Sequence, residues 1–299
     1  DEGVFEVPLG GTGFKEQTDV IEQGTQYSAD ILFVVDDSGS MGNDQTKLAN
    51  SFSTFITWLI DHTISFHIGV TTTDMSASGN QGTFYGSPKV LENDTPNLVA
   101  EFTDNVHVGT SGSASEKGLD GAVAALTYPN IANENTGFLR DDAKLFVVFV
   151  SDEEDQSTES VSYYVDLLTA VKDGNPEDLF LAAIAGPATG SCSGDGTAPA
   201  APRYNEAIAL TGGLYGSICD SDFGVTLQNL AFEITSPTAE FFLSYLPDLD
   251  TLKVKVDGVQ QGEERWAYDP FTNSVVFGAA YVPPMGADVS IEYSAIDTF

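Results

Sequence analysis

The chain has 299 residues, enough for one large core or for two domains, and its 41% hydrophobic content is typical of a globular protein. Its 45 acidic and 11 basic residues give a formal net charge of −34. Because nucleic acids and anionic membrane surfaces attract basic faces, this charge argues against both as partners. No apolar run is long enough to span a membrane, so we expect no direct membrane insertion of this segment.

Strand-like and helix-like segments alternate after residue 28. Apolar runs typical of buried strands lie at 29–35, 65–73, 144–150, 179–185 and 214–219. Amphipathic or capped segments predict helices at 44–61, 97–102, 118–126, 161–171, 203–210 and 225–234. A broken run at 82–91 indicates a hairpin or an edge strand. This alternation predicts an α/β domain at 29–235, with a doubly wound, mostly parallel central sheet flanked by helices.

The pattern changes near residue 236. Short runs of strand character, separated by turn sequences, follow at 240–243, 252–256, 265–268, 274–277 and 289–293. We therefore expect a small all-β sandwich at 236–299 and an N-terminal extension at 1–28. Trp266 and Tyr268 fit either a carbohydrate-binding surface or packing within a strand, and we favour packing.

Small polar side chains follow the first buried strand. Asp36, Ser38 and Ser40 occupy alternate positions in one turn, where their oxygens can converge on a hard cation. The spacing Asp-x-Ser-x-Ser after a hydrophobic strand resembles the metal-ion-dependent adhesion site of von Willebrand factor A domains. The resemblance covers roughly residues 29–235. It implies a Rossmann-like fold and a bound Mg²⁺, with Ca²⁺ or Mn²⁺ as alternatives.

The resemblance also implies a threonine ligand from a later loop and an aspartate ligand after the central strand. Asp152 follows the apolar run at 144–150 and matches the aspartate. Thr110 is our choice for the threonine. Ser113 and Glu116 are alternative ligands, but their spacing also fits a capping box for the next helix, and we favour capping.

Acidic neighbours of these loops are candidates for a supporting role. Asp37 and Glu153 are alternative ligands or partners of metal-bound water, whereas we expect Glu154 to be solvated. Because serine and threonine hydroxyls are neutral, a bound cation keeps much of its charge and can accept a carboxylate from a partner. Such capture makes no covalent bond, so we predict that the protein is not an enzyme.

Cys192 and Cys219 are the only cysteines, and they flank a segment rich in glycine, proline and alanine. This arrangement favours a disulfide that closes the loop, and a disulfide would indicate a compartment outside the cytosol. Two unrelated buried thiols are the alternative.

Three functions follow from these features. The leading one is an extracellular or cell-surface adhesion module of a bacterial protein, in which the cation captures an acidic group of a protein or other ligand. We expect its export signal or anchor to lie outside these 299 residues, because residue 1 does not begin a signal peptide. The alternatives are a subunit of an enzyme-associated complex, chelatase- or protease-linked, and a structural stalk unit whose metal only rigidifies the loops.

Overall fold

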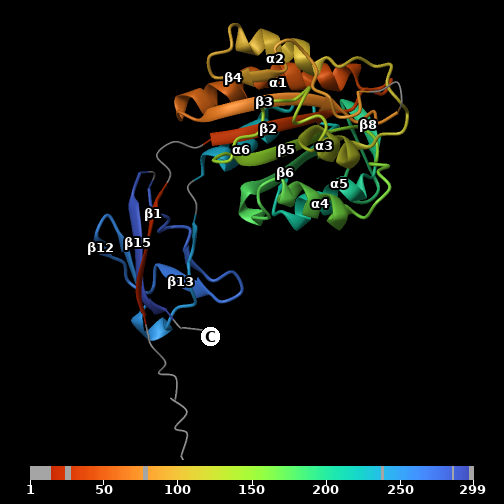
Figure 1. Ribbon diagram of the computed structural model, residues 1–299. Coiled ribbons are helices and arrows are strands. Elements are labelled where there is room, and N and C mark those ends of the chain that lie inside the picture. Colours follow the sequence, from red (N-terminus) through yellow and green to blue (C-terminus); the bar gives the residue numbers. More distant parts are fainter. Residues whose placement is uncertain (1–14, 24–27, 77–79, 237–238, 285, 296–299) are drawn as a thin grey trace, which may run out of the picture. The chain divides into compact units, whose positions relative to one another are not determined.

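The computed structural model describes residues 15–23, 28–76, 80–236, 239–284 and 286–295. The chain divides into two compact units. One is Gln26–Thr235, and the other joins Asp1–Thr25 to Ser236–Phe299. Figure 1 labels their helices and strands.

The larger unit contains a six-stranded sheet in the order β4-β3-β2-β5-β6-β9. Its strands are β2 (Ser28–Val35), β3 (Ser65–Thr72), β4 (Val90–Glu92), β5 (Lys144–Val150), β6 (Leu179–Ala185) and β9 (Leu214–Ser217). Neighbouring strands pair in parallel except for β4, which runs antiparallel to β3. A separate hairpin consists of β7 (Ser191–Gly194) and β8 (Gly196–Pro199).

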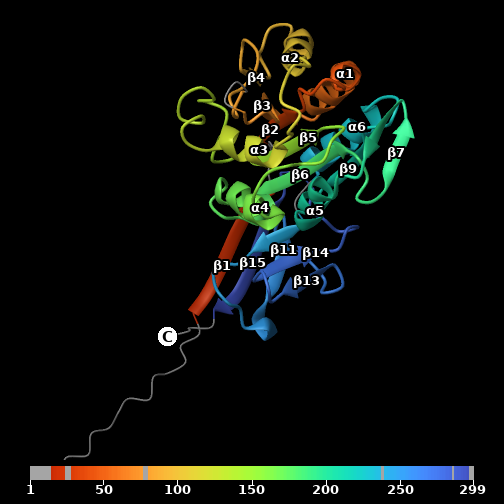
Figure 2. The ribbon, with the colours of Figure 1, turned by 90° about the vertical axis from the view of Figure 1, so that its right-hand side faces the viewer.

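Helices cover both faces of this sheet (Figure 2). One face carries α1 (Gly42–Asp61), α2 (Leu98–Val106) and α6 (Gly224–Thr235), and the other carries α3 (Gly118–Leu126), α4 (Val161–Ala170) and α5 (Pro202–Leu210). A short 3-10 helix, η1 (Pro176–Asp178), precedes β6. Successive side chains of β2 point to opposite faces: Phe33 and Val35 enter the core with α1, whereas Leu32 and Val34 enter the core with α3. This two-sided burial explains why β2 is an almost continuous apolar run.

The smaller unit is built from two antiparallel sheets and the 3-10 helix η2 (Leu249–Thr251). The four-stranded sheet has the order β1-β15-β11-β12, with β1 (Lys15–Glu22), β15 (Asp288–Ala295), β11 (Lys253–Val256) and β12 (Val259–Gln260). The three-stranded sheet has the order β10-β14-β13, with β10 (Glu240–Phe242), β14 (Ser274–Phe277) and β13 (Trp266–Asp269). Phe241, Val275, Ile291 and Tyr293 are buried in the core of this unit. Trp266 and Tyr268 pack partly buried against that core, so the structure favours the packing interpretation.

The predicted fold class was wrong. The described residues form four sheets, of which three are wholly antiparallel and the six-stranded one is mixed. The chain is therefore a mixed α/β protein rather than a doubly wound, mostly parallel domain with a C-terminal sandwich appended. The described residues between β3 and β4 form no helix, and a parallel connection needs such a crossover. We also missed β1, a largely polar strand in which Val20 is 66% exposed.

Candidate functional site

The carboxyl ends of three neighbouring strands bring two of the predicted loops together. In the parallel register, Val35 of β2 lies beside Val150 of β5 and beside Thr72 of β3. The Asp36 amide donates to the Val150 carbonyl at 2.9 Å, and the Thr73 amide donates to the Val35 carbonyl at 3.3 Å. Residues that follow these strands therefore share one edge of the sheet, where ligand sites of such sheets commonly lie.

The buried Asp36 carboxylate organises the first loop. Its Oδ1 accepts a hydrogen bond from the Ser38 amide at 2.7 Å, and its Oδ2 accepts one from the Ser151 hydroxyl at 2.6 Å. The hydroxyl oxygens of Ser38 and Ser40 lie 3.4 Å apart. Burial raises the pKa of Asp36, and the negative charge of Asp152 raises it further. The motif thus gathers three oxygen-bearing side chains.

Glu116 lies fully buried next to this loop. The Thr73 hydroxyl donates to its Oε2 at 2.5 Å, whereas its Oε1 has no hydrogen-bond partner among the described residues. Burial raises the pKa of the Glu116 carboxyl to about 8, and the charges of Asp36 and Asp37 contribute to the rise. The ionised form of Glu116 therefore lacks a stabilising partner on one oxygen, and a bound cation would supply one.

The capping box that we favoured for Ser113 and Glu116 was wrong. Helix α3 begins further along the chain, and its N-cap residue makes no side-chain capping bond. In its first turn, the Leu119 amide donates instead to Asp155 Oδ1 at 3.1 Å. The Ser113 hydroxyl accepts a bond from the Ser115 amide at 3.0 Å. Because another loop caps the helix, the Glu116 carboxyl is left to face Asp36.

Asp152 follows β5 at the same edge. Its Oδ1 is buried without a hydrogen-bond partner among the described residues. Asp152 and Ser40 both line a hollow of about 230 Å³. The adjacent Glu153 is exposed, and its pKa is raised by partial burial and by the charges of Asp152 and Asp36. Asp152 therefore lies where it can act together with the first loop, and the neighbouring Glu153 is exposed beside it.

The next two acids of this loop support the fold. Asp155 Oδ2 pairs with Arg203 Nε at 2.8 Å. Glu154 Oε1 accepts bonds from the Asp155 amide at 2.9 Å and from the Arg203 amide at 3.2 Å. Our expectation that Glu154 is simply solvated does not match these contacts, because it holds the first turn of α5.

Gln45 of α1 links the second loop to the first. The Gln45 Nε2 donates to the Asp36 carbonyl at 3.0 Å and to the Gly109 carbonyl at 2.7 Å. Thr110 is exposed on this loop and lines a different hollow together with Asp37. It also lies close to the first loop, because a Cβ atom at Gly42 would be 3.5 Å from Thr110 Cγ2. Of the second-loop candidates, Glu116 is the one whose pKa is raised by the charge of Asp36.

No group of three or more His, Cys, Asp or Glu side chains in the described part of the chain is arranged to hold a metal ion. A cation at this edge would therefore depend on serine hydroxyls as well as on carboxylates. The side chains that the structure brings to this edge are those of Asp36, Ser38, Ser40, Glu116 and Asp152.

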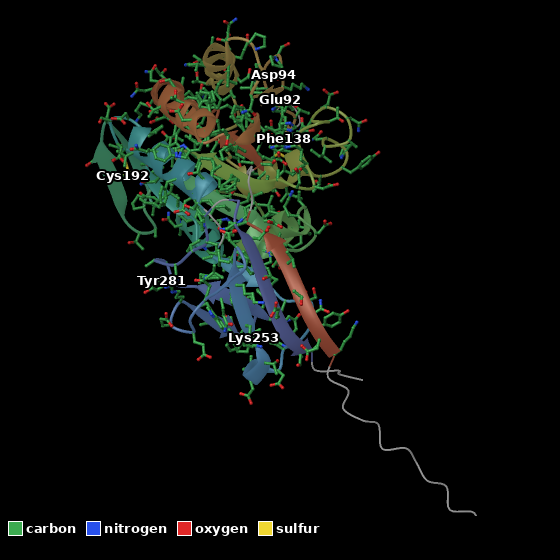
Figure 3. The ribbon with its side chains drawn as sticks, turned by 90° about the vertical axis from the view of Figure 1, so that its left-hand side faces the viewer. Glu92, Asp94, Phe138, Cys192, Lys253 and Tyr281 are labelled. Carbon is green, nitrogen blue, oxygen red and sulfur yellow. A yellow bond between two sulfur atoms is a disulfide. The ribbon has the colours of Figure 1, made fainter. Side chains whose placement is uncertain are left out.

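A disulfide-closed hairpin forms one wall of the hollow beside Ser40. Cys192 of β7 is bonded to Cys219, so the predicted disulfide is confirmed; Figure 3 labels Cys192. The Asp195 amide in the hairpin turn donates to the Cys219 carbonyl at 2.9 Å. Asp195 and Thr197 line the hollow together with Ser40. The bridge therefore fixes a surface next to the candidate site.

Lys47, which the sequence patterns did not single out, fastens this hairpin to α1. Its buried ammonium group donates to the carbonyls of Asp195, Ile218 and Asp220 at 3.1, 3.0 and 2.9 Å. It also pairs with Asp44 at 2.7 Å. Lysine on a helix usually lies at the surface, so only the three-dimensional contacts identify this role.

No family model and no curated protein matches the chain. Similar solved structures include the pilus adhesin SpaC from Lactobacillus rhamnosus GG, at 11% identity over 95% of this chain with a TM-score of 0.47. The minor pilin PilB from Streptococcus sanguinis is 14% identical over 71% of this chain and 62% of its own, with a TM-score of 0.43. Proximal thread matrix protein 1 from the mussel byssus is 14% identical over 73% of this chain and 47% of its own, with a TM-score of 0.39.

The chain spans 42% of the length of the SpaC chain. Two of these three similar structures are bacterial pilus proteins. Among the described residues, no helix is long and apolar enough to cross a membrane.

Proposed function

We propose that the chain is an extracellular or cell-surface adhesion module of a bacterial protein, with a site like the metal-ion-dependent adhesion site of von Willebrand factor A domains. A divalent cation held at the sheet edge captures a carboxylate of a partner protein or other ligand. The residues that would hold the cation are Asp36, Ser38, Ser40, Glu116 and Asp152.

The observation that carries this proposal is a pair of buried oxygens without hydrogen-bond donors, Glu116 Oε1 and Asp152 Oδ1. A buried polar atom left unpaired costs about 1–3 kcal/mol, and a nearby cation removes that cost. No ion pair among the described residues involves Asp36, Glu116 or Asp152. The acidic edge therefore lacks a positive partner from the chain itself, which supports a bound cation.

The donor atoms suit a hard cation. Hydroxyl and carboxylate oxygens are the ligands of Mg²⁺, our first choice, and also suit Ca²⁺ and Mn²⁺. When bound, the cation would supply a positive centre that an acidic group of a partner can reach. The Ser38 amide and the Ser151 hydroxyl orient the Asp36 carboxylate, and the Thr73 hydroxyl orients Glu116.

We favour Glu116 as the second-loop ligand, and Thr110 stays a prediction. When Asp36, Asp152 and Glu116 are all ionised, their charge exceeds that of a divalent cation, which weakens the attraction for an acidic partner. This feature favours one second candidate function, a surface or stalk module whose metal mainly rigidifies the loops. The disulfide argues against the enzyme-associated alternative, because such bridges persist mainly outside the cytosol.

Calorimetric titration of the chelator-treated chain with Mg²⁺, Ca²⁺ and Mn²⁺ tests the cation. We expect one saturable site in the wild type and none in the double variant Asp36→Ala, Asp152→Ala. The matched control is Asp94→Asn, an exposed aspartate labelled in Figure 3, which should bind as the wild type does. Equal binding by the double variant would contradict the proposal.

Acetate then distinguishes capture from rigidification. In an amide NMR titration, we expect acetate to shift the signals of residues 38–42 only when Mg²⁺ is bound. Mg²⁺ binding without any acetate effect would favour the structural candidate.

A further inference from the structure

A hollow of about 300 Å³ lies next to the candidate cation site and is not part of it. Two aspartates, Asp37 and Asp74, line it together with Asn80, Tyr85 and the second loop at 108–112. Asp36 and Asp37 are consecutive in the first loop. The Asp36 carboxylate belongs to the candidate cation site, whereas Asp37 lines this hollow.

Asp37 is held in the wall of the hollow. Its side chain is 5% exposed, and its Oδ1 is buried without a hydrogen-bond partner among the described residues. The Gly112 amide donates to the Asp37 carbonyl at 2.8 Å. A Cβ atom at Gly112 would lie 2.2 Å from Asp37 Cγ, so the loop packs directly on this carboxyl group. Burial and then the charges of Asp74 and Asp36 raise the pKa of Asp37 to about 6.

Asp74 supplies a second carboxylate that is oriented by backbone amides. Its Oδ1 accepts a bond from the Ser76 amide at 2.8 Å, and its Oδ2 accepts one from the Ser113 amide at 3.1 Å. Burial alone would raise the pKa of Asp74, but a hydrogen bond with the Ser76 side chain and those from the two amides outweigh it and lower the pKa. The hollow therefore holds one carboxylate that accepts two backbone hydrogen bonds and one with an unpaired oxygen.

Among the described residues, no lysine or arginine lines this hollow. All 11 lysines and arginines fall within the described residues, and none is among those that line it. Tyr85 adds a half-buried aromatic ring to the wall. Burial raises the pKa of the Tyr85 hydroxyl, and the charges of Asp37 and Asp74 contribute to the rise. Two carboxylates and an aromatic face are a combination that attracts organic cations.

We propose that this hollow is a subsite for a basic side chain of the partner, a lysine ammonium or an arginine guanidinium group. Its volume exceeds what a bare metal ion needs, and two carboxylates with a tyrosine ring match a flat or tetrahedral organic cation. Combined with the proposed function, on which this part rests, the partner class becomes a protein segment that presents an acidic and a basic side chain close together. The acidic one meets the cation, and the basic one enters the hollow.

Amide NMR titration of the full chain with methylguanidinium and with methylammonium tests the subsite. We expect saturable shifts at Tyr85 and at residues 109–112, in chelator as well as in Mg²⁺. Asp74→Asn should weaken binding about fivefold, the upper end for loss of one partly exposed ion pair. Tyr85→Leu should also weaken it and leaves both carboxylates in place. Asp94→Asn serves as the control for general attraction to an acidic protein and should bind as the wild type does.

Three outcomes decide the matter. Shifts that do not saturate and are equal in Asp74→Asn would overturn the subsite, because they would reflect only the net charge. Displacement of methylguanidinium from the same amides by Mg²⁺ or Ca²⁺ would overturn it in favour of an inorganic cation. Saturable methylguanidinium binding in a chain that fails to bind Mg²⁺ would support the subsite while refuting the proposed metal function.

Discussion

The Thr73 hydroxyl binds one oxygen of the Glu116 carboxyl group and leaves the other buried without a donor. Thr73 follows β3 and Glu116 precedes α3, so the contact ties the sheet edge to the second loop. The same edge carries Asp36, whose charge acts on Glu116. We therefore expect the ionisation of the Glu116 carboxyl group to affect both the stability of the fold and the binding of a cation.

The metal-free chain should become less stable as the pH rises. The pKa of Glu116 is about 8 in the folded chain against an ordinary 4.5, so folding retains a proton that the unfolded chain releases. The stability that this provides is complete below about pH 4.5 and is lost as the pH rises through about 8. Asp37, with a pKa of about 6, acts in the same direction at lower pH.

Melting temperatures of the wild type and of Glu116→Gln in chelator, at pH 5 and at pH 9, check this prediction. Glutamine does not ionise, so the wild type should lose stability relative to Glu116→Gln between the two values. The comparison cancels the effect of the overall negative charge, because both chains share it. A constant difference between the two chains would contradict the assigned direction of the shift.

Replacing Lys47 by methionine should lower the free energy of unfolding by roughly 3 kcal/mol, because one buried and two partly buried carbonyls lose their donor and Asp44 loses its ion pair. Chemical denaturation measures the loss. Lys89→Met is the matched control, since Lys89 forms a more exposed pair with Glu134 and its loss should cost much less than that of Lys47. Equal losses in the two variants would mean that Lys47 does not fasten the hairpin.

Removing the disulfide should destabilise the larger unit. The bridge closes a loop between cysteines 27 positions apart, for which chain entropy suggests a contribution of about 3.5 kcal/mol. We expect the double variant Cys192→Ser, Cys219→Ser to unfold at lower denaturant concentration and to show faster amide exchange at residues 191–199. If the double variant keeps the wild-type denaturation midpoint and amide-exchange rates, the bridge does not hold this wall of the hollow.

The central strands could be predicted from the sequence because a strand that is buried on both faces is apolar along nearly its whole length. β5 and β6 are almost continuous apolar runs, and each was placed correctly. Strand β1 could not be predicted, since its mostly polar sequence is stabilised by pairing with β15 at the far end of the chain. The antiparallel direction of β4 depends on its pairing with β3, which three residues do not reveal.

Only part of the candidate site could be predicted from the sequence. Asp36, Ser38 and Ser40 are close in sequence, so their spacing indicated that their oxygens could meet. The role of Glu116 depends on which groups cap α3, and those groups come from a loop some 40 residues later. A motif that fits a capping box cannot show that another loop has already satisfied the helix.

A crystal structure of the chain grown with Mn²⁺, read by anomalous scattering, would show whether a cation occupies this sheet edge. We expect one strong peak at the carboxyl ends of β2 and β5, about 2.1 Å from oxygens of Asp36 and the neighbouring hydroxyl or carboxyl ligands. Glu116 should contribute one of them. An empty edge at saturating Mn²⁺, or a peak bound only elsewhere, would contradict the proposed cation site.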